Sequence, residues 1–213
     1  MIAVAHKIVS KAEGRVRRLA EIEPGPKARA LGTEHGKDPS LVQAVLDESA
    51  ELIRVERGVM IARTRHGLVC ANAGIDQSNV AAAGELVLLP EDPDASARAI
   101  RAGIADARGV RPAVLITDSF GRAWRLGEID VAIGASGLRT LDDWRGRPDG
   151  AGRELRVTAI AVADAAAAAA DLARAKDSRE PAVLVRGLER FVTPGDGPGA
   201  AALRRPPELD LFG

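Results

Sequence analysis

The stretch that organises this chain is Val114–Asp130, which reads VLITDSFGRAWRLGEID. Its first residues form a short apolar run rich in β-branched side chains, a pattern typical of a buried strand. Asp118 and Ser119 follow this run, and Gly121 can let the chain turn away. The sequence therefore predicts a carboxylate and a hydroxyl side by side at the exit of a strand.

These residue types suit metal and phosphate chemistry. Hard divalent cations prefer oxygen ligands and usually leave positions open for substrate phosphates. Arg122 and Arg125 carry planar guanidinium groups that can bind phosphate or carboxylate oxygens. On this stretch alone, a plain strand-to-loop turn with two solvated arginines is an equal alternative.

A second polar stretch lies at residues 71–80. It contains Asn72, Asp76, Ser78 and Asn79, and no lysine within the loop neutralises the carboxylate. A loop so rich in oxygen atoms can hold a cation. The alternative is a loop whose side chains bond their own backbone in Asx turns.

The first fifteen residues combine an apolar start with several basic and hydroxyl side chains. The start predicts a strand that begins at the first residue. The side chains that follow could line a phosphate site, and a solvated basic edge strand is the alternative. They are His6, Lys7, Ser10, Lys11 and Arg15.

Composition limits the class of protein. The chain has 213 residues, of which 46% are hydrophobic, as in a globular protein with a core. Lys plus Arg and Asp plus Glu both number 30, so no basic field attracts nucleic acid or an anionic membrane. The single cysteine, Cys70, excludes an intramolecular disulfide, and no apolar run reaches the ~20 residues that span a bilayer. We therefore expect a soluble, cytoplasmic protein whose partners are neither nucleic acid nor membrane.

The remaining pattern predicts an α/β fold, with mixed sheets and covering helices. We expect one domain over residues 1–190 and a Gly/Pro-rich C-terminal tail over 191–213, in which residues 193–207 form a mobile linker. Helices are expected at residues 38–57, with Glu48 facing outward, at 93–108 and at 164–173. Strands are expected at residues 59–62, 67–70, 86–89, from 114, 129–134, 155–162 and 182–185.

Taken together, the chain resembles the coenzyme F420-0:L-glutamate ligase family, the GTP-dependent γ-glutamyl ligases of deazaflavin cofactor biosynthesis. The resemblance rests on three separated segments in the family's order: HKIVSKAEGR at 6–15, AGIDQSN at 73–79 and ITDSFGRAWR at 116–125. It continues through Asp130–Gly134 and Ala163–Asp164 to Val185–Gly187, and so covers nearly everything up to about residue 190.

The resemblance implies a γ-glutamyl ligase-type fold that forms an intertwined homodimer. It also implies an activity in which GTP phosphorylates the terminal carboxylate of the phospholactyl side chain of coenzyme F420-0. The amine of L-glutamate then displaces phosphate from this acyl phosphate and forms an amide. Two Mg²⁺ or Mn²⁺ ions are implied at each site, with K⁺ as a further candidate ion.

Residue by residue, the resemblance makes Asp76, Asp118 and Arg122 the catalytic residues. Asp76 and Asp118 would hold the first metal, and Ser119 would take a hydroxyl position at the second. The implied nucleotide contacts are His6, Lys7, Lys11, Asn79 and Lys176.

The chain departs from the family pattern at a few positions. Lys176 and Glu128 stand where glutamine is usual, and Ser119 replaces the commoner threonine. Relatives also carry a segment before the first strand, and we expect the N-terminal segment of the family to be missing here. Two alternatives follow: a catalytically weak, dimeric nucleotide- and metal-binding paralogue, or a ligase that acts on another small carboxylate.

Overall fold

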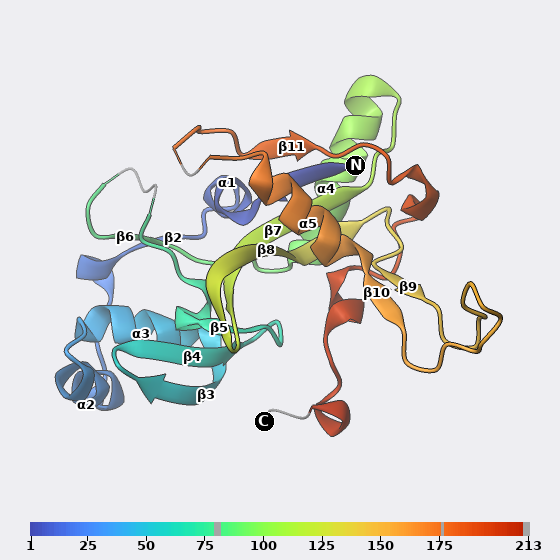
Figure 1. The fold of residues 1–213 in the computed structure, drawn as a ribbon. Helices are drawn as coiled ribbons and strands as arrows, with labels where there is room; N and C mark the ends of the chain where they lie inside the picture. The colour runs from blue at the N-terminus through green and yellow to red at the C-terminus, as the bar shows by residue number, and fades with distance from the viewer. Residues whose placement is uncertain (79–81, 176, 211–213) are drawn as a thin grey trace. The chain divides into compact units, whose positions relative to one another are not determined.

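The computed structural model describes residues 1–78, 82–175 and 177–210, and Figure 1 traces them. The chain divides into two compact units. The first unit comprises Met1–Ala5, Pro93–Ser119 and Ile129–Gly213, and the second comprises His6–Asp92 and Phe120–Glu128. Both contain helices and sheets, so the predicted mixed α/β class is confirmed.

The first unit is built on a four-stranded sheet with the strand order β11-β1-β7-β8. Short 3₁₀ turns at Glu189–Phe191, Ala200–Leu203 and Pro207–Leu209 follow the last strand. The helices and strands are β1 (Ile2–Ala5), α4 (Pro93–Arg108), β7 (Val114–Arg122), β8 (Arg125–Ser136), β9 (Leu141–Asp143), β10 (Ala159–Ala161), α5 (Val162–Leu172) and β11 (Ala182–Leu184).

The strand at the start of the chain is internal to this sheet. β1 pairs in parallel with β7, with Ile2 opposite Val114, and antiparallel with β11 on its other side. The basic residues that follow β1 form a helix instead of continuing the strand. The edge-strand alternative for this segment is therefore wrong.

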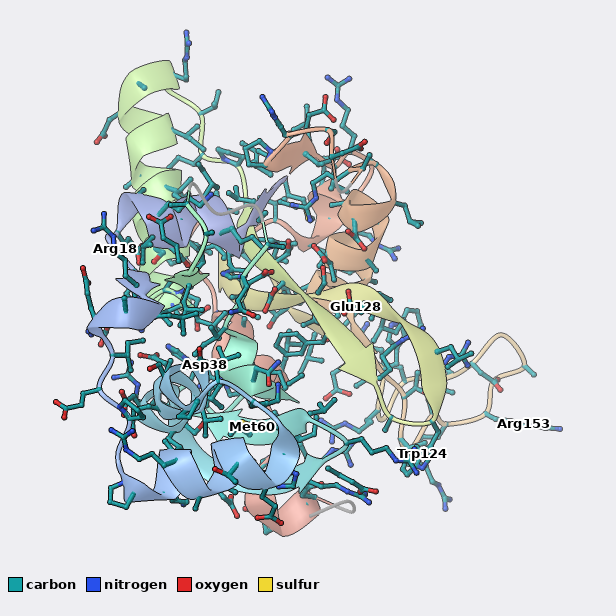
Figure 2. All side chains as sticks on the ribbon, turned by 90° about the vertical axis from the view of Figure 1, so that its left-hand side faces the viewer. Arg18, Asp38, Met60, Trp124, Glu128 and Arg153 are labelled. Atoms are coloured by element: carbon teal, nitrogen blue, oxygen red, sulfur yellow. The ribbon has the colours of Figure 1, made fainter. Side chains whose placement is uncertain are left out.

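The strand that carries Asp118 continues past it to Arg122, so the predicted strand exit is wrong. β8 pairs with β7 and begins only three residues later, so the turn is Ala123–Trp124. Trp124 has a positive φ of 57° and is 84% exposed at this turn (Figure 2). Asp118 and Ser119 therefore lie within a paired strand, where alternation decides the direction of each side chain.

The two helices of the first unit lie where the sequence predicts them. α4 begins at Pro93, and its start lies so close to β8 that a Cβ on Gly134 would sit 2.3 Å from the carbonyl oxygen of Pro93. α5 lies near β1 and β9 (Figure 1). Its buried alanines are Ala163, Ala166, Ala167 and Ala170.

Residues 193–200 are held by α4, so the linker interpretation is wrong for them. Arg101 is 1% exposed, and its guanidinium donates to the carbonyl oxygens of Thr193 and Pro194 and to Asp196 Oδ1 at 3.0 Å. The backbone N–H of Ala200 donates to Asp94 Oδ1 at 2.7 Å. Polar partners on α4 thus order a Gly/Pro-rich segment; the domain boundary at residue 190 stays a prediction.

The second unit packs helices α2 and α3 against the three-stranded sheet β3-β4-β5, and also contains the strand pair β2-β6. Figure 1 shows α3 beside the β3–β4 hairpin. Met60 on β4 is 1% exposed in the core of this unit (Figure 2). The elements are α1 (His6–Ala12), β2 (Val16–Arg18), α2 (Pro26–His35), α3 (Pro39–Glu48), β3 (Ser49–Glu56), β4 (Val59–Thr64), β5 (Val69–Ala71) and β6 (Glu85–Val87), with 3₁₀ turns at Leu19–Glu21 and Asn72–Gly74.

The helix predicted for residues 38–57 ends at Glu48, and β3 follows it directly. The start was predicted correctly, because Asp38 caps the helix by accepting from the N–H of Ser40 at 2.7 Å. The end was wrong because two register shifts interrupt β3, one between Ser49 and Glu51 and one near Leu52. Each shift adds a residue, so the less exposed positions recur every third residue and imitate a helical period.

The predicted hairpin after β3 is confirmed as β4 and β5, whereas the strand predicted at residues 155–162 is limited to β10. In the described ranges of the chain, no helix is both long and apolar enough to cross a membrane.

Candidate active site

Helix α1 carries three of the residues expected to contact nucleotide, and it presents them differently. His6 is 1% exposed, and its Nδ1 lies 3.4 Å from Ser10 Oγ within the same helix. Lys7 is half-buried, and Lys11 is exposed in the last turn. Lys11 is thus the most solvent-exposed of these three side chains.

Lys7 contacts the polar loop that follows β5. Its Nζ lies 2.6 Å from Asp76 Oδ2 and donates to Ser78 Oγ at 2.8 Å. The N–H of Ser78 also donates to Asp76 Oδ1. The loop has no lysine of its own, but α1 supplies Lys7, which neutralises the Asp76 carboxylate.

The environment of Asp76 favours its charged form. Burial alone would raise the pKa of Asp76, but the hydrogen bonds from Lys7 and Ser78 together outweigh burial and lower it. The backbone of Asp76 is fixed as well, because its N–H and carbonyl both bond to Val87, at 3.0 and 2.9 Å. The Ser78 N–H bond is an Asx turn, so this part of the alternative interpretation of the loop is confirmed. Asn79 lies outside the described residues.

Arg15, a further candidate for phosphate binding, is engaged by carboxylates. Its guanidinium donates to Glu48 Oε2 at 2.7 Å, pairs with Glu91 at 3.2 Å and donates to the carbonyl of Leu89. Arg65 also donates to Glu48, and this bond raises the pKa of Arg65. Glu48 is buried, so the prediction that it faces outward is wrong, and Arg15 stabilises the fold of this unit.

Arg122 lies near the β7–β8 turn. One of its terminal nitrogens donates to the carbonyl of Leu126 at 2.9 Å, which ties the two strands together beside the turn. Its expected catalytic role stays a prediction.

In the first unit, Asp118 lies between two hydroxyl residues that share one acceptor. Thr117 Oγ1 donates to Asp130 Oδ2 and Ser119 Oγ donates to Asp130 Oδ1, both at 2.7 Å. Side chains alternate along a strand, so Asp118 projects from the opposite face of β7. The N–H of Ser119 donates to Asp118 Oδ1 at 2.9 Å and so restricts the carboxylate's rotation.

Arg174 completes this cluster from the residues just after α5. It forms an ion pair with Asp130 Oδ2 and donates to Thr117 Oγ1 at 3.0 Å. The Arg174 and Asp130 side chains are 8% and 5% exposed. The structure thus defines a Thr117–Ser119–Asp130–Arg174 cluster, called the Asp130 cluster below.

Sequence reasoning missed most of the Asp130 cluster. From the sequence alone, Asp130 is predicted only as part of a longer motif, and no role is predicted for Thr117 or Arg174. The β7–β8 hairpin could have indicated the contact between Thr117 and Asp130. Counting outward along both strands from a two-residue turn at Ala123–Trp124 places these two residues opposite each other. No comparable signal points to Arg174, and Lys176, nearby in sequence, lies outside the described residues.

Asp164, at the start of α5, is a second acidic group of the first unit. Burial raises its pKa, although its Oδ1 accepts a hydrogen bond from the N–H of Ala132 at 2.9 Å, which acts in the opposite direction. It belongs to a segment of the resemblance, and here it ties α5 to β8.

Each unit contains a carboxylate of the kind that hard divalent cations prefer, Asp76 in the second unit and Asp118 in the first. Asp76 and Asp118 offer carboxylate oxygens, whereas the Ser119 hydroxyl donates its proton to Asp130. Within residues 1–78, 82–175 and 177–210, no three His, Cys, Asp or Glu side chains form a closed metal cage. Mg²⁺ is usually held by one or two carboxylates, with waters and phosphates completing its shell.

The sequence that carries these acidic, hydroxyl and basic groups matches a known class of ligase. Residues 1–187 match the family model of F420-0:Gamma-glutamyl ligase, and the chain belongs to this family. It is 46% identical over 214 residues to the coenzyme F420:L-glutamate ligase of Methanopyrus kandleri, with 100% of this chain and 84% of the relative covered. It is 47% identical over 213 residues to the protein of that name from Methanothermobacter thermautotrophicus, with the same coverage, and 44% identical over 218 residues to that from Haloarcula marismortui, with 99% and 82% covered. The resemblance stated from the three motifs is therefore confirmed.

Proposed function

We propose that this chain is a coenzyme F420-0:L-glutamate ligase that uses GTP and a divalent metal ion. The observation that carries the proposal is the contact of Lys7 with Asp76 and Ser78. It joins the first and second of the three family motifs, which are far apart in the sequence, into one polar cluster. The family match and the names of the relatives support the same activity.

The proposed reaction has two steps. A carboxylate oxygen of the F420-0 side chain attacks the γ-phosphorus of GTP, so an acyl phosphate forms and GDP leaves. The amine nitrogen of L-glutamate then attacks the acyl carbon, the C–O bond to phosphate breaks, and an amide and inorganic phosphate result. The amine loses a proton in this step. Activation is needed because a carboxylate is a poor electrophile, and most of the barrier is positioning and charge neutralisation.

The chain's own residues would supply the positioning. Asp76 and Asp118 would each hold metal through carboxylate oxygens, and Lys7 and Lys11 would bind phosphate oxygens as positive charges. Bound Mg²⁺ or Mn²⁺ supplies neutralisation of the phosphate charge. Arg122 would bind a phosphate or carboxylate oxygen through its guanidinium fork. Asn79, His6 and Lys176 complete the proposed nucleotide contacts.

The proposal includes a homodimer, as the family resemblance implies, and a cytoplasmic location, as the composition predicts. Sedimentation velocity on the purified chain measures the assembly directly. A single species at twice the 22.3 kDa mass of the chain is expected. A monomer that is fully active would contradict this part of the proposal.

Product analysis by mass spectrometry tests the reaction. The purified protein is incubated with F420-0, L-glutamate, GTP and Mn²⁺, and each component is omitted in turn. The expected result is a mass gain of one or more glutamyl units that requires all four. GTP bound without product would favour the binding paralogue, and product only when another small carboxylate replaces F420-0 would favour the other ligase.

A further inference from the structure

We propose that Asp130 and Arg174 are positioning residues that hold the Asp118 carboxylate in the orientation needed for metal binding. The inference rests on the proposed function, in which Asp118 is a metal ligand. It assigns a role to the Asp130 cluster, in which the Arg174 and Asp130 side chains are only 8% and 5% exposed.

The hydrogen bonds on the two sides of Asp118 are symmetric. The residues on either side of it, Thr117 and Ser119, each donate a hydrogen bond of 2.7 Å to the same carboxylate. Both neighbours are thus fixed on one face of β7. The peptide that bears Asp118 cannot twist without breaking one of these bonds, so its side chain is directed to the other face.

Asp130 is itself anchored by Arg174. A buried carboxylate is costly unless it is paired and hydrogen-bonded, and Arg174 supplies the opposite charge. Arg174 also donates to Thr117 Oγ1, so one guanidinium contacts both the acceptor and one of its donors. The end of α5 is thereby fixed to the strand that carries Asp118.

The contacts of Asp130 favour a positioning role over direct metal binding. Oδ1 of Asp130 accepts from Ser119, and Oδ2 accepts from both Thr117 and Arg174. The Asp130 side chain is also only 5% exposed, whereas the Asp76 side chain, which is proposed as a ligand, is 28% exposed. Asp130 is therefore suited to orient a ligand rather than to serve as one, the role of the outer residues that support metal sites.

The experiment measures Mn²⁺ binding without turnover, by the electron paramagnetic resonance signal of free Mn²⁺ during titration of the protein. Asp130→Asn keeps the shape and removes the charge, and we expect its dissociation constant for Mn²⁺ to rise roughly 10- to 100-fold. The dissociation constant of Asp118→Asn for Mn²⁺ should rise by at least the same factor. Arg174→Lys keeps the positive charge but not the forked guanidinium group. Its dissociation constant for Mn²⁺ should lie between those of the wild type and Asp130→Asn.

Asp196→Asn is the matched control. It removes the carboxylate partner of another buried arginine, Arg101, in the same unit. It should lower the thermal unfolding midpoint while leaving the Mn²⁺ affinity unchanged. If Asp130→Asn does not fold, Thr117→Val, which removes one of the two flanking donors, must show the weaker Mn²⁺ binding.

The outcomes distinguish the inference from the function it rests on. If Asp118→Asn weakens Mn²⁺ binding but folded Asp130→Asn, or Thr117→Val in its place, binds like wild type, the positioning role is wrong and the ligase proposal stands. If Asp118→Asn binds Mn²⁺ like wild type, Asp118 is not a ligand, and both the metal assignment and the positioning role are wrong. In steady-state assays, positioning predicts that Asp130→Asn raises the Mn²⁺ requirement and that excess Mn²⁺ restores much of kcat.

Discussion

Lys7 and Asp76 form an ion pair of 2.6 Å that joins the first helix to the loop after β5. Ser78 bonds to both side chains, so the two charges and one hydroxyl form a closed set of contacts. Because these residues belong to two separate family motifs, their contact links the motifs through one local electrostatic interaction.

This pair should make stability depend on pH in the acidic range. The pKa of Asp76 is lowered in the folded state from its ordinary value of 3.8, so the pair stabilises the fold above that value. The stabilisation is lost as pH falls through the lower, folded pKa. In Lys7→Met the effect of burial remains without this hydrogen bond, and the pKa of Asp76 should rise.

Urea unfolding at several pH values measures the consequence. Lys7→Met should be less stable than wild type by about 1 kcal/mol at pH 7, and the difference should shrink as the pH falls below 3.8. Lys27→Met, at an exposed position of α2, should show no such trend. A deficit that stays constant down to pH 2 would show that the effect is packing and not charge.

The metal assignment predicts parallel losses in Asp76→Asn and Asp118→Asn. Each replacement keeps the side-chain shape and removes the charge that attracts a cation. At limiting Mn²⁺, each should lower the rate of GTP-dependent amide formation by roughly 100-fold. Asp106→Asn, at an exposed site on α4, should be unchanged. Full turnover by either metal-site variant at limiting Mn²⁺ would remove that residue from the proposed ligand set.

Elements with clear local signals could be predicted from the sequence. α4 lies at residues 93–108 as expected, because Pro93 marks its first turn and its apolar positions repeat at helical spacing. β3 could not be recognised, because the register shifts at Glu51 and Arg54 give a strand a three-residue period. The sequence contains no sign of those extra residues.

In the candidate site, too, features that depend on neighbouring residues in the sequence could be predicted, whereas contacts between distant segments could not. Asp118 and Ser119 can be predicted as candidate ligands because they are adjacent in the sequence. That their side chains point in opposite directions follows only from their position inside β7. The Lys7–Asp76 contact depends on the fold, since nothing in either segment indicates the other. Arg174 is the hardest residue to predict, because it is 44 residues from its partner Asp130 in the sequence.

The buried Glu48 offers a test of the network around Arg15. Glu48 accepts from Arg15 and Arg65, and its side chain is 10% exposed, whereas Glu91 pairs with the same two arginines at 68% exposure. Glu48→Gln should lower the free energy of unfolding by about 2 kcal/mol, because it weakens two charge-assisted hydrogen bonds in a buried setting. Glu91→Gln should cost less than about 0.5 kcal/mol. Equal losses in urea titrations would show that burial does not decide the strength of these pairs.

Gly134 should be far less replaceable than Gly103, although both lie in the first unit. A Cβ on Gly134 would sit 2.3 Å from the carbonyl oxygen and 2.5 Å from the carbonyl carbon of Pro93, and backbone atoms cannot rotate away as a side chain can. Gly134→Ala should therefore push the start of α4 from β8 and lower the free energy of unfolding by about 3 kcal/mol. A Cβ on Gly103, inside α4, meets nothing within 4 Å, so Gly103→Ala should instead raise it by about 1 kcal/mol through helix propensity. Chemical denaturation of the two variants shows whether the free energy of unfolding changes in opposite directions. A Gly134→Ala protein as stable as wild type would mean that α4 does not approach β8 this closely in solution.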